Sequence, residues 1–172
     1  MSQNFKYVKT CIIASLLVGC APAPKPWSSD ETQREKVPTV SAKASNSHHH
    51  EAPHGGTLVM LGDHVGHVEL VLDTESGVLT AYVLDGEAER PVRIGMPALR
   101  LVISPDSRES FPLELSPVAD PLSGETAGDT SVFRIEDERL QGLAQFRGSL
   151  QAIEIRGITL ADVAFSFPEG NE

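Results

Sequence analysis

Short runs of alternating apolar and polar residues, each followed by a turn signal, constrain the fold of this chain more than any other feature. Alternation with a period of two indicates β-strands with one buried face, and closely spaced strands joined by turns pair antiparallel. Gly, Asp, Ser and Pro between the runs supply the turns. Nine strands are expected, at 57–61, 65–72, 78–84, 91–94, 98–103, 111–115, 132–135, 146–155 and 159–167.

This pattern predicts an all-β domain, an antiparallel immunoglobulin-like β-sandwich of eight or nine strands, with a small barrel as the alternative. Residues 118–130, rich in Gly, Ser and Asp, are expected to form a long loop. The one helical candidate, 137–145, contains Gly142 and is expected to give no more than a short turn of helix. Three strands carry a clear core face, namely Leu99, Leu101 and Ile103, then Phe111, Leu113 and Leu115, then Val163, Phe165 and Phe167.

The first residues read as a secretory signal. Lys6 and Lys9 precede an apolar stretch, 11–18, that is too short to span a bilayer. The stretch ends Leu-Val-Gly-Cys at 17–20, which resembles the lipobox of bacterial lipoproteins. The resemblance implies a lipid on Cys20 and, with Ala21 in place of aspartate, an anchor in the outer membrane facing the periplasm. We therefore expect a signal peptide at 1–19, a lipidated, disordered linker at 20–47 and the β-sandwich domain at 48–169.

Charge and cysteine content exclude several functions for the mature chain. Cleavage removes Lys6, Lys9 and Cys11, which leaves 12 basic and 24 acidic residues and a formal charge of −12. A nucleic-acid partner is disfavoured because phosphate contacts need a basic surface, whereas cations are attracted. With Cys20 modified by lipid, no thiol remains for a disulfide, a thiolate metal site or a nucleophile.

All six histidines lie between residues 48 and 67, where the linker meets the first strands. Imidazole binds divalent transition metals, so this clustering predicts a metal site. If Gly62 and Asp63 form the two-residue turn of a hairpin, Leu58 pairs with His67 and Gly56 pairs with Glu69.

That register places His54, His67 and Glu69 together on the exposed side of the hairpin, where the missing side chain of Gly56 leaves room above Glu69. Two imidazoles and a carboxylate suit copper, zinc, nickel or cobalt as divalent ions. His64 falls on the opposite side and is a weaker candidate. Just after the linker, His48 and His50 offer further ligands. The alternative is a solvated histidine tract that binds metal weakly without a dedicated site.

Residues 53–58, Pro-His-Gly-Gly-Thr-Leu, followed by Gly62-Asp63 and Val-Glu-Leu at 68–70, resemble an N-terminal, metal-associated segment of periplasmic adaptor subunits of heavy-metal efflux pumps. The resemblance covers about twenty residues and implies a role in handling copper, zinc, cobalt or nickel. It carries over to five positions, His54, Gly55, Gly56, Asp63 and Glu69. A two-residue insertion that brings in His67 departs from the adaptor pattern.

We expect an envelope lipoprotein that binds a divalent transition metal as an accessory to metal homeostasis or efflux, with efflux components as possible partners. The alternative is a lipid-tethered protein-interaction module whose histidines are incidental, and the long loop 118–130 is its best support. An enzyme is not expected, because the chain carries no Gly-x-Ser-x-Gly, phosphate-binding Gly-rich loop, HExxH or CxxC motif.

Overall fold

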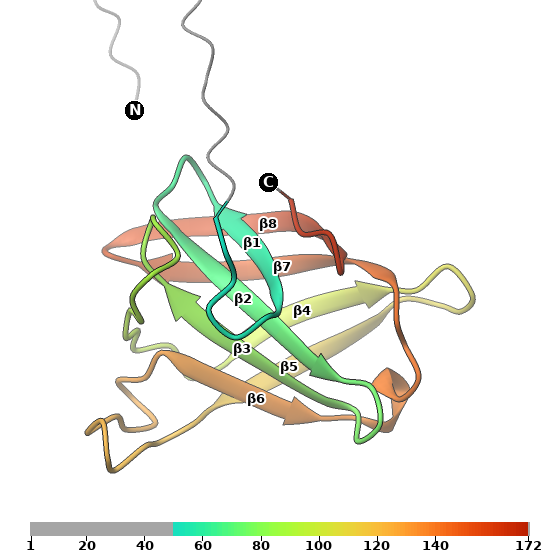
Figure 1. Cartoon of the computed structure of the whole chain (residues 1–172), viewed down its shortest axis with the longest axis horizontal. Coiled ribbons are helices and arrows are strands. Elements are labelled where there is room, and N and C mark those ends of the chain that lie inside the picture. Colours follow the sequence, from blue (N-terminus) through green and yellow to red (C-terminus); the bar gives the residue numbers. More distant parts are fainter. Residues whose placement is uncertain (1–49, 172) are drawn as a thin grey trace, which may run out of the picture. The chain divides into compact units, whose positions relative to one another are not determined.

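The computed structural model describes residues 50–171, which form an antiparallel all-β domain (Figure 1). The expected signal peptide and linker, Cys20 and His48 lie outside the described residues. The fold class predicted from alternation is confirmed. The described residues form eight strands, β1 (Thr57–Leu61), β2 (Gly66–Asp73), β3 (Val78–Leu84), β4 (Leu99–Ser104), β5 (Phe111–Pro117), β6 (Val132–Glu136), β7 (Phe146–Ile155) and β8 (Ile158–Phe167).

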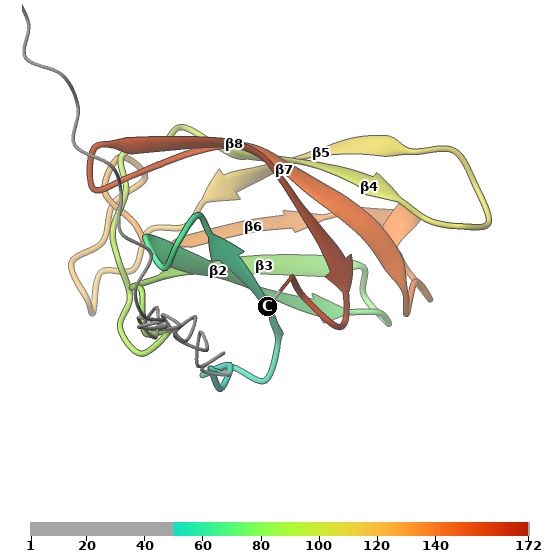
Figure 2. The ribbon, with the colours of Figure 1, turned by 90° about the horizontal axis from the view of Figure 1, so that it is seen from above.

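The strands belong to one hydrogen-bonded sheet with the order β1-β2-β3-β6-β5-β4-β7-β8. The sheet folds over itself, so that β1, β2, β3 and β6 face β5, β4, β7 and β8 as two layers (Figure 2). The layers join where β5 pairs with β6, through only two residue pairs, Ser116 with Arg134 and Pro117 with Phe133. The fold is therefore a sandwich made from a single, nearly closed sheet.

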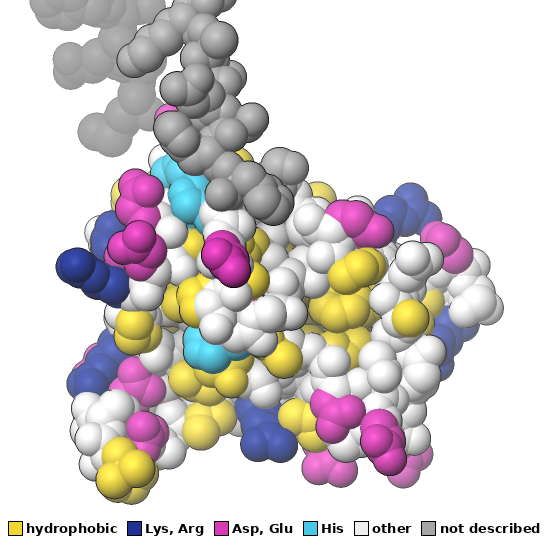
Figure 3. All heavy atoms as spheres, viewed as in Figure 1, with side chains coloured by type: hydrophobic (Ala, Val, Ile, Leu, Met, Phe, Trp, Pro, Cys, Tyr) yellow, Lys and Arg dark blue, Asp and Glu magenta, His cyan; other side chains and the backbone are white. Residues whose placement is uncertain are grey.

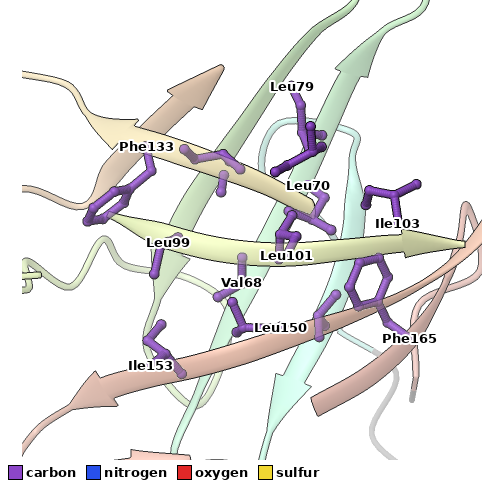
Figure 4. Packing of buried hydrophobic residues seen from close by; sticks show 14 of the residues in the cluster. Val68, Leu70, Leu79, Leu99, Leu101, Ile103, Phe133, Leu150, Ile153 and Phe165 are labelled. Atoms are coloured by element: carbon purple, nitrogen blue, oxygen red, sulfur yellow. The ribbon is translucent and has the colours of Figure 1, made fainter. Parts of the chain in front are cut away.

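The main core lies between the two layers (Figure 4). Burial of each large aliphatic or aromatic side chain there contributes about 1.5–3 kcal/mol. The core faces predicted for β4, β5 and β8 are confirmed, although Val163 and Phe167 are only partly buried. One layer supplies Val68, Leu70, Leu79 and Phe133, and the other supplies Leu99, Leu101, Ile103, Leu150, Ile153 and Phe165.

Two predicted segments, a strand and a short helix, need comment. The strand expected at 91–94 is wrong, because only isolated bridges join Pro91 to Leu84 and Ile94 to Thr130. Proline has no N–H to donate to a ladder, which favours such a short contact. The helical candidate gives one 3-10 turn, Glu138–Leu140, capped by the Asp137 side chain. No helix among the described residues is long and apolar enough to cross a membrane.

The C-terminal residues lie over the seam between the two end strands, β1 and β8. The Asn171 side chain accepts a hydrogen bond from the Met60 N–H (2.7 Å) and donates to the carbonyls of Met60 (3.2 Å) and Ala164 (3.1 Å). The Thr57 hydroxyl donates to the Pro168 carbonyl at 3.0 Å. The packed domain thus extends to residue 171, two residues beyond the predicted boundary at 169.

Candidate metal centre

The turn between β1 and β2 decides where the histidines lie, and it is longer than predicted. Leu61 pairs with Gly66, so the loop has four residues, 62–65, and the Val65 N–H donates to the Leu61 carbonyl at 3.0 Å. Val65 packs against the core, which a two-residue turn would not allow. The predicted register is therefore wrong by two residues, and Leu58 faces Glu69 while Met60 faces His67.

A shift of two residues preserves which side chains share a face, so His67 and Glu69 do lie on the outer face of β2, opposite the main core. The prediction that this face is exposed is wrong. Both His67 and Glu69 have no exposed surface. Residues 50–56 pass across β2 (Figure 1), and a second small cluster of Leu58, Leu84 and Ala88 packs beneath the covering chain.

The Glu69 carboxylate holds this covering segment in place. One carboxylate oxygen accepts hydrogen bonds from the backbone N–H groups of His54 and Gly56, both at 2.8 Å. The other oxygen lies 2.6 Å from His54 Nδ1, which is the donor because the carboxylate only accepts. The predicted proximity of His54 and Glu69 is thus confirmed. We name this arrangement of Glu69, His54 and Gly56 the Glu69 clamp.

The prediction that Gly56 leaves open space above Glu69 is wrong. The missing side chain instead lets the backbone itself approach β2. A Cβ at position 56 would lie 2.5 Å from the Leu70 carbonyl oxygen and 3.0 Å from Glu69 Cγ. The imidazole of His54 stacks on Tyr82 of β3, with ring centroids 3.7 Å apart and planes 8° apart. His54 is therefore held by a carboxylate and an aromatic ring.

His67 is directed to a different place. Its Nδ1 donates a hydrogen bond to the backbone carbonyl of Asp85, at 3.0 Å, because a carbonyl oxygen only accepts. In the neutral ring Nε2 then carries the lone pair that a metal would use. The His67 ring lies 4.8 Å from that of His50 and 6.1 Å from that of His64, between centroids. The His50 and His64 rings are 5.3 Å apart.

We call His50, His64 and His67 the histidine triangle. Its three members come from the segment before β1, the β1–β2 loop and β2. Their side chains differ in exposure, because that of His50 is 8% exposed and that of His64 is 42% exposed, whereas His67 is fully buried. Figure 3 shows histidine side chains at separate places on this face, with Asp and Glu side chains beside the upper group.

The loop after β3, residues 85–90, completes the surroundings of the triangle. Burial raises the pKa of the Asp85 carboxyl, but hydrogen bonds from the backbone N–H groups of Glu89, Arg90 and Glu87 lower it by more. The net pKa therefore lies below its usual range. Hydrogen bonds from Glu89 (3.0 Å) and Arg90 (3.2 Å) to one carboxylate oxygen hold the loop closed.

Gly86 permits the loop to contact the β1–β2 hairpin, since a Cβ there would lie 2.3 Å from the His64 carbonyl oxygen. In the same loop, the carboxylate of Glu87 has an oxygen 3.9 Å from His50 Nε2. Glu87 was not identified as a site residue from the sequence. The 85–90 loop lies beside the histidines because β2 pairs with β3, with His67 opposite Leu84. This pairing was not predicted from the sequence.

The predicted site residues thus separate into two groups. His54 and Glu69 form the clamp, whereas His67 joins His50 and His64, so the predicted trio of His54, His67 and Glu69 does not meet. His64, ranked as a weaker candidate because it was expected on the opposite side, has its ring beside the other two, since the four-residue loop carries it there. Among the predicted turn residues, Gly55 and Gly62 adopt positive φ and Asp63 is exposed, with one oxygen 3.4 Å from His64 Nδ1.

Within residues 50–171, no group of three or more His, Cys, Asp or Glu side chains already stands in coordinating geometry. The triangle therefore gathers ligand-bearing rings without converging their nitrogen atoms. His64, with a half-exposed side chain in a loop, is the member whose rotation costs least. Comparison of the chain with family models, curated proteins and solved structures found no match.

Proposed function

We propose that this protein is an envelope lipoprotein that binds one divalent transition metal ion through the histidine triangle, as an accessory to metal homeostasis or efflux. The observation that carries the proposal is the spacing of His50, His64 and His67. A metal–nitrogen bond of about 2.0–2.1 Å puts the metal about 3.2 Å from each ring centroid, so tetrahedral ligands have centroids about 5.2 Å apart. The observed separations of 4.8, 5.3 and 6.1 Å bracket this value.

The surroundings of His67 support the same proposal. Metal-binding histidines commonly donate their second ring nitrogen to a carbonyl or carboxylate, which sets the tautomer and the ring orientation. The bond from His67 Nδ1 to the Asp85 carbonyl is of this kind. Imidazole ligands suit Zn²⁺, Cu²⁺, Ni²⁺ and Co²⁺, and the acidic mature chain attracts such cations.

The test is a calorimetric titration of Zn²⁺ and Cu²⁺ into the full chain and three variants. We expect His64→Ala to weaken binding roughly tenfold or more, because loss of a ligand costs at least as much as loss of a supporting hydrogen bond. His54→Ala should weaken binding less than His64→Ala, because the clamp positions the segment that carries His50 but supplies no ligand. His49→Ala, outside the described residues, controls for a loose histidine tract.

Two results would overturn the proposal. One is a wild-type chain that binds neither ion. The other is a His64→Ala variant with unchanged affinity beside a His49→Ala variant that has lost it, which would place binding in the histidine tract.

A second candidate function is protein interaction through the 118–130 loop. This loop is ordered by bridges between Asp120 and Glu125 and between Thr126 and Asp129, and it holds Leu122 with 99% of its surface exposed. Loops of this length in small domains are often functional, and Leu122 is the apolar side chain that a partner would bury here. Cross-linking in envelope preparations with a photoreactive residue at position 122 would test this candidate, and absence of any adduct would contradict it.

A further inference from the structure

We propose that Glu87 is the fourth ligand of the metal, so that the site is a three-histidine, one-carboxylate site for a small divalent cation. This inference rests on the proposed function and adds to it the donor set and the class of ion. Its starting point is the position of the Glu87 carboxylate, which lies beside the only triangle member that comes from the segment before β1.

The distance between Glu87 and His50 fits a bridging metal better than a hydrogen bond. The Glu87 oxygen and His50 Nε2 are 3.9 Å apart, beyond the hydrogen-bond range. A nitrogen and an oxygen that share one tetrahedral ion lie about 3.3 Å apart, given metal–ligand bonds of about 2.0–2.1 Å. A closure of about half an ångström therefore suffices, and the Glu87 side chain, 78% exposed, has the freedom to make it.

The backbone around Glu87 keeps the carboxylate near the triangle. Asp85, two residues earlier, supplies the carbonyl that accepts from both His67 Nδ1 and the Ala88 N–H, at 3.0 and 3.1 Å. Ala88, the next residue, is buried in the small cluster with Leu58 and Leu84. The residues on both sides of Glu87 are thus anchored, and its side chain opens into a hollow also lined by His50, Glu51 and Glu89.

A carboxylate in the donor set narrows the class of ion. Three neutral imidazoles leave a divalent ion with its full charge, and one carboxylate reduces the net charge of the site to +1. Oxygen donors favour divalent ions, whereas Cu⁺ prefers sulfur donors. We therefore infer a site for a divalent transition ion, with Glu87 as the oxygen donor and with Zn²⁺ and Cu²⁺ as the probe ions.

The test compares Glu87→Gln with Glu89→Gln in the full chain. The two substitutions remove the same charge from the same loop, so they separate ligation from general electrostatics. With Zn²⁺ as the probe in calorimetry, we expect Glu87→Gln to weaken binding about tenfold or more and Glu89→Gln to weaken it less than about threefold. With Cu²⁺, the electron paramagnetic resonance parameters should change only in Glu87→Gln.

A rescue variant distinguishes a ligand from a nearby charge. Glu87→His removes the negative charge but supplies a nitrogen donor at the same place, so it should bind Zn²⁺ more tightly than Glu87→Gln. Equal affinities for Glu87→Gln and Glu89→Gln, in a chain whose binding still falls in His64→Ala, would overturn the role of Glu87 and leave the proposed function standing. A chain that binds no metal, or whose binding His64→Ala leaves unchanged, would instead overturn the proposed function.

Discussion

At the scale of single residues, the contact of Glu69 with His54 was predicted, whereas its burial was not. Its proximity to His54 follows from strand parity, which survives a register shift of two residues. Its burial does not follow, because residues 50–56 carry no alternation that would reveal them as a cover for β2. A carboxylate that accepts three N–H bonds in a dry site is a structural anchor, and the sequence pattern alone does not distinguish an anchor from a ligand.

Glu69→Gln should therefore lower the free energy of unfolding, by about 1.5–3 kcal/mol, because the amide keeps one acceptor and turns an N–H group toward the donors of His54 or Gly56. Urea denaturation followed by circular dichroism measures the loss. Glu114→Gln, in an exposed pair with Arg100, is the control and should cost less than about 1 kcal/mol. A Glu69→Gln chain of unchanged stability but lost metal affinity would restore Glu69 as a ligand.

At the scale of elements, the strands were predictable and their connections less so. The bounds of β1, β3 and β7 match the predicted ranges residue for residue, and in β3 and β7 buried positions largely alternate with less buried ones. The β1–β2 loop was mispredicted because Gly62-Asp63 favours a tight turn locally, while packing of Val65 against the core requires a longer one. The histidine triangle depends on that loop, so its membership was not predictable from pairing rules.

The seam between β1 and β8 gives a prediction at this scale. The Asn171 side chain presents an acceptor and a donor to Met60, as a neighbouring peptide group would. Asn171→Ala should lower the free energy of unfolding by about 1–2 kcal/mol, because it removes three partly exposed hydrogen bonds. Chemical denaturation of this variant and of Glu169→Ala, an exposed neighbour, provides the comparison. Equal stabilities of the two variants would show that the seam is held by other contacts.

At the scale of the whole molecule, the sequence predicted the all-β class and a sandwich of about the right strand number, since both follow from counting short strands. It did not predict that the two layers would be one continuous sheet, because that depends on the short β5–β6 pairing at Pro117. Nor did it indicate that the two ends of the described chain would both pack on β1, through the small cluster at Leu58 and the side chain of Asn171 at Met60.

The predicted lipid anchor concerns the molecule as a whole, although Cys20 lies outside the described residues. Cys20→Ser should release the protein from membrane fractions, because serine cannot form the thioether that joins the lipid. Immunoblotting of membrane and soluble fractions measures the shift, with Cys11→Ser, inside the expected signal, as the matched control. A Cys20→Ser protein that still sediments wholly with membranes would refute lipidation at this position.

The Glu69 clamp has a consequence for how related sequences are interpreted. A His-Gly-Gly run followed by a Val-Glu-Leu strand encodes a latch, in which the glutamate fastens the chain that precedes its own hairpin. Wherever the same two pieces occur at the spacing of His54 and Glu69, we expect the histidine to face a carboxylate and not an ion. Searches for metal sites in such chains should then begin at the hairpin tip and the facing loop, and treat the latch as their scaffold.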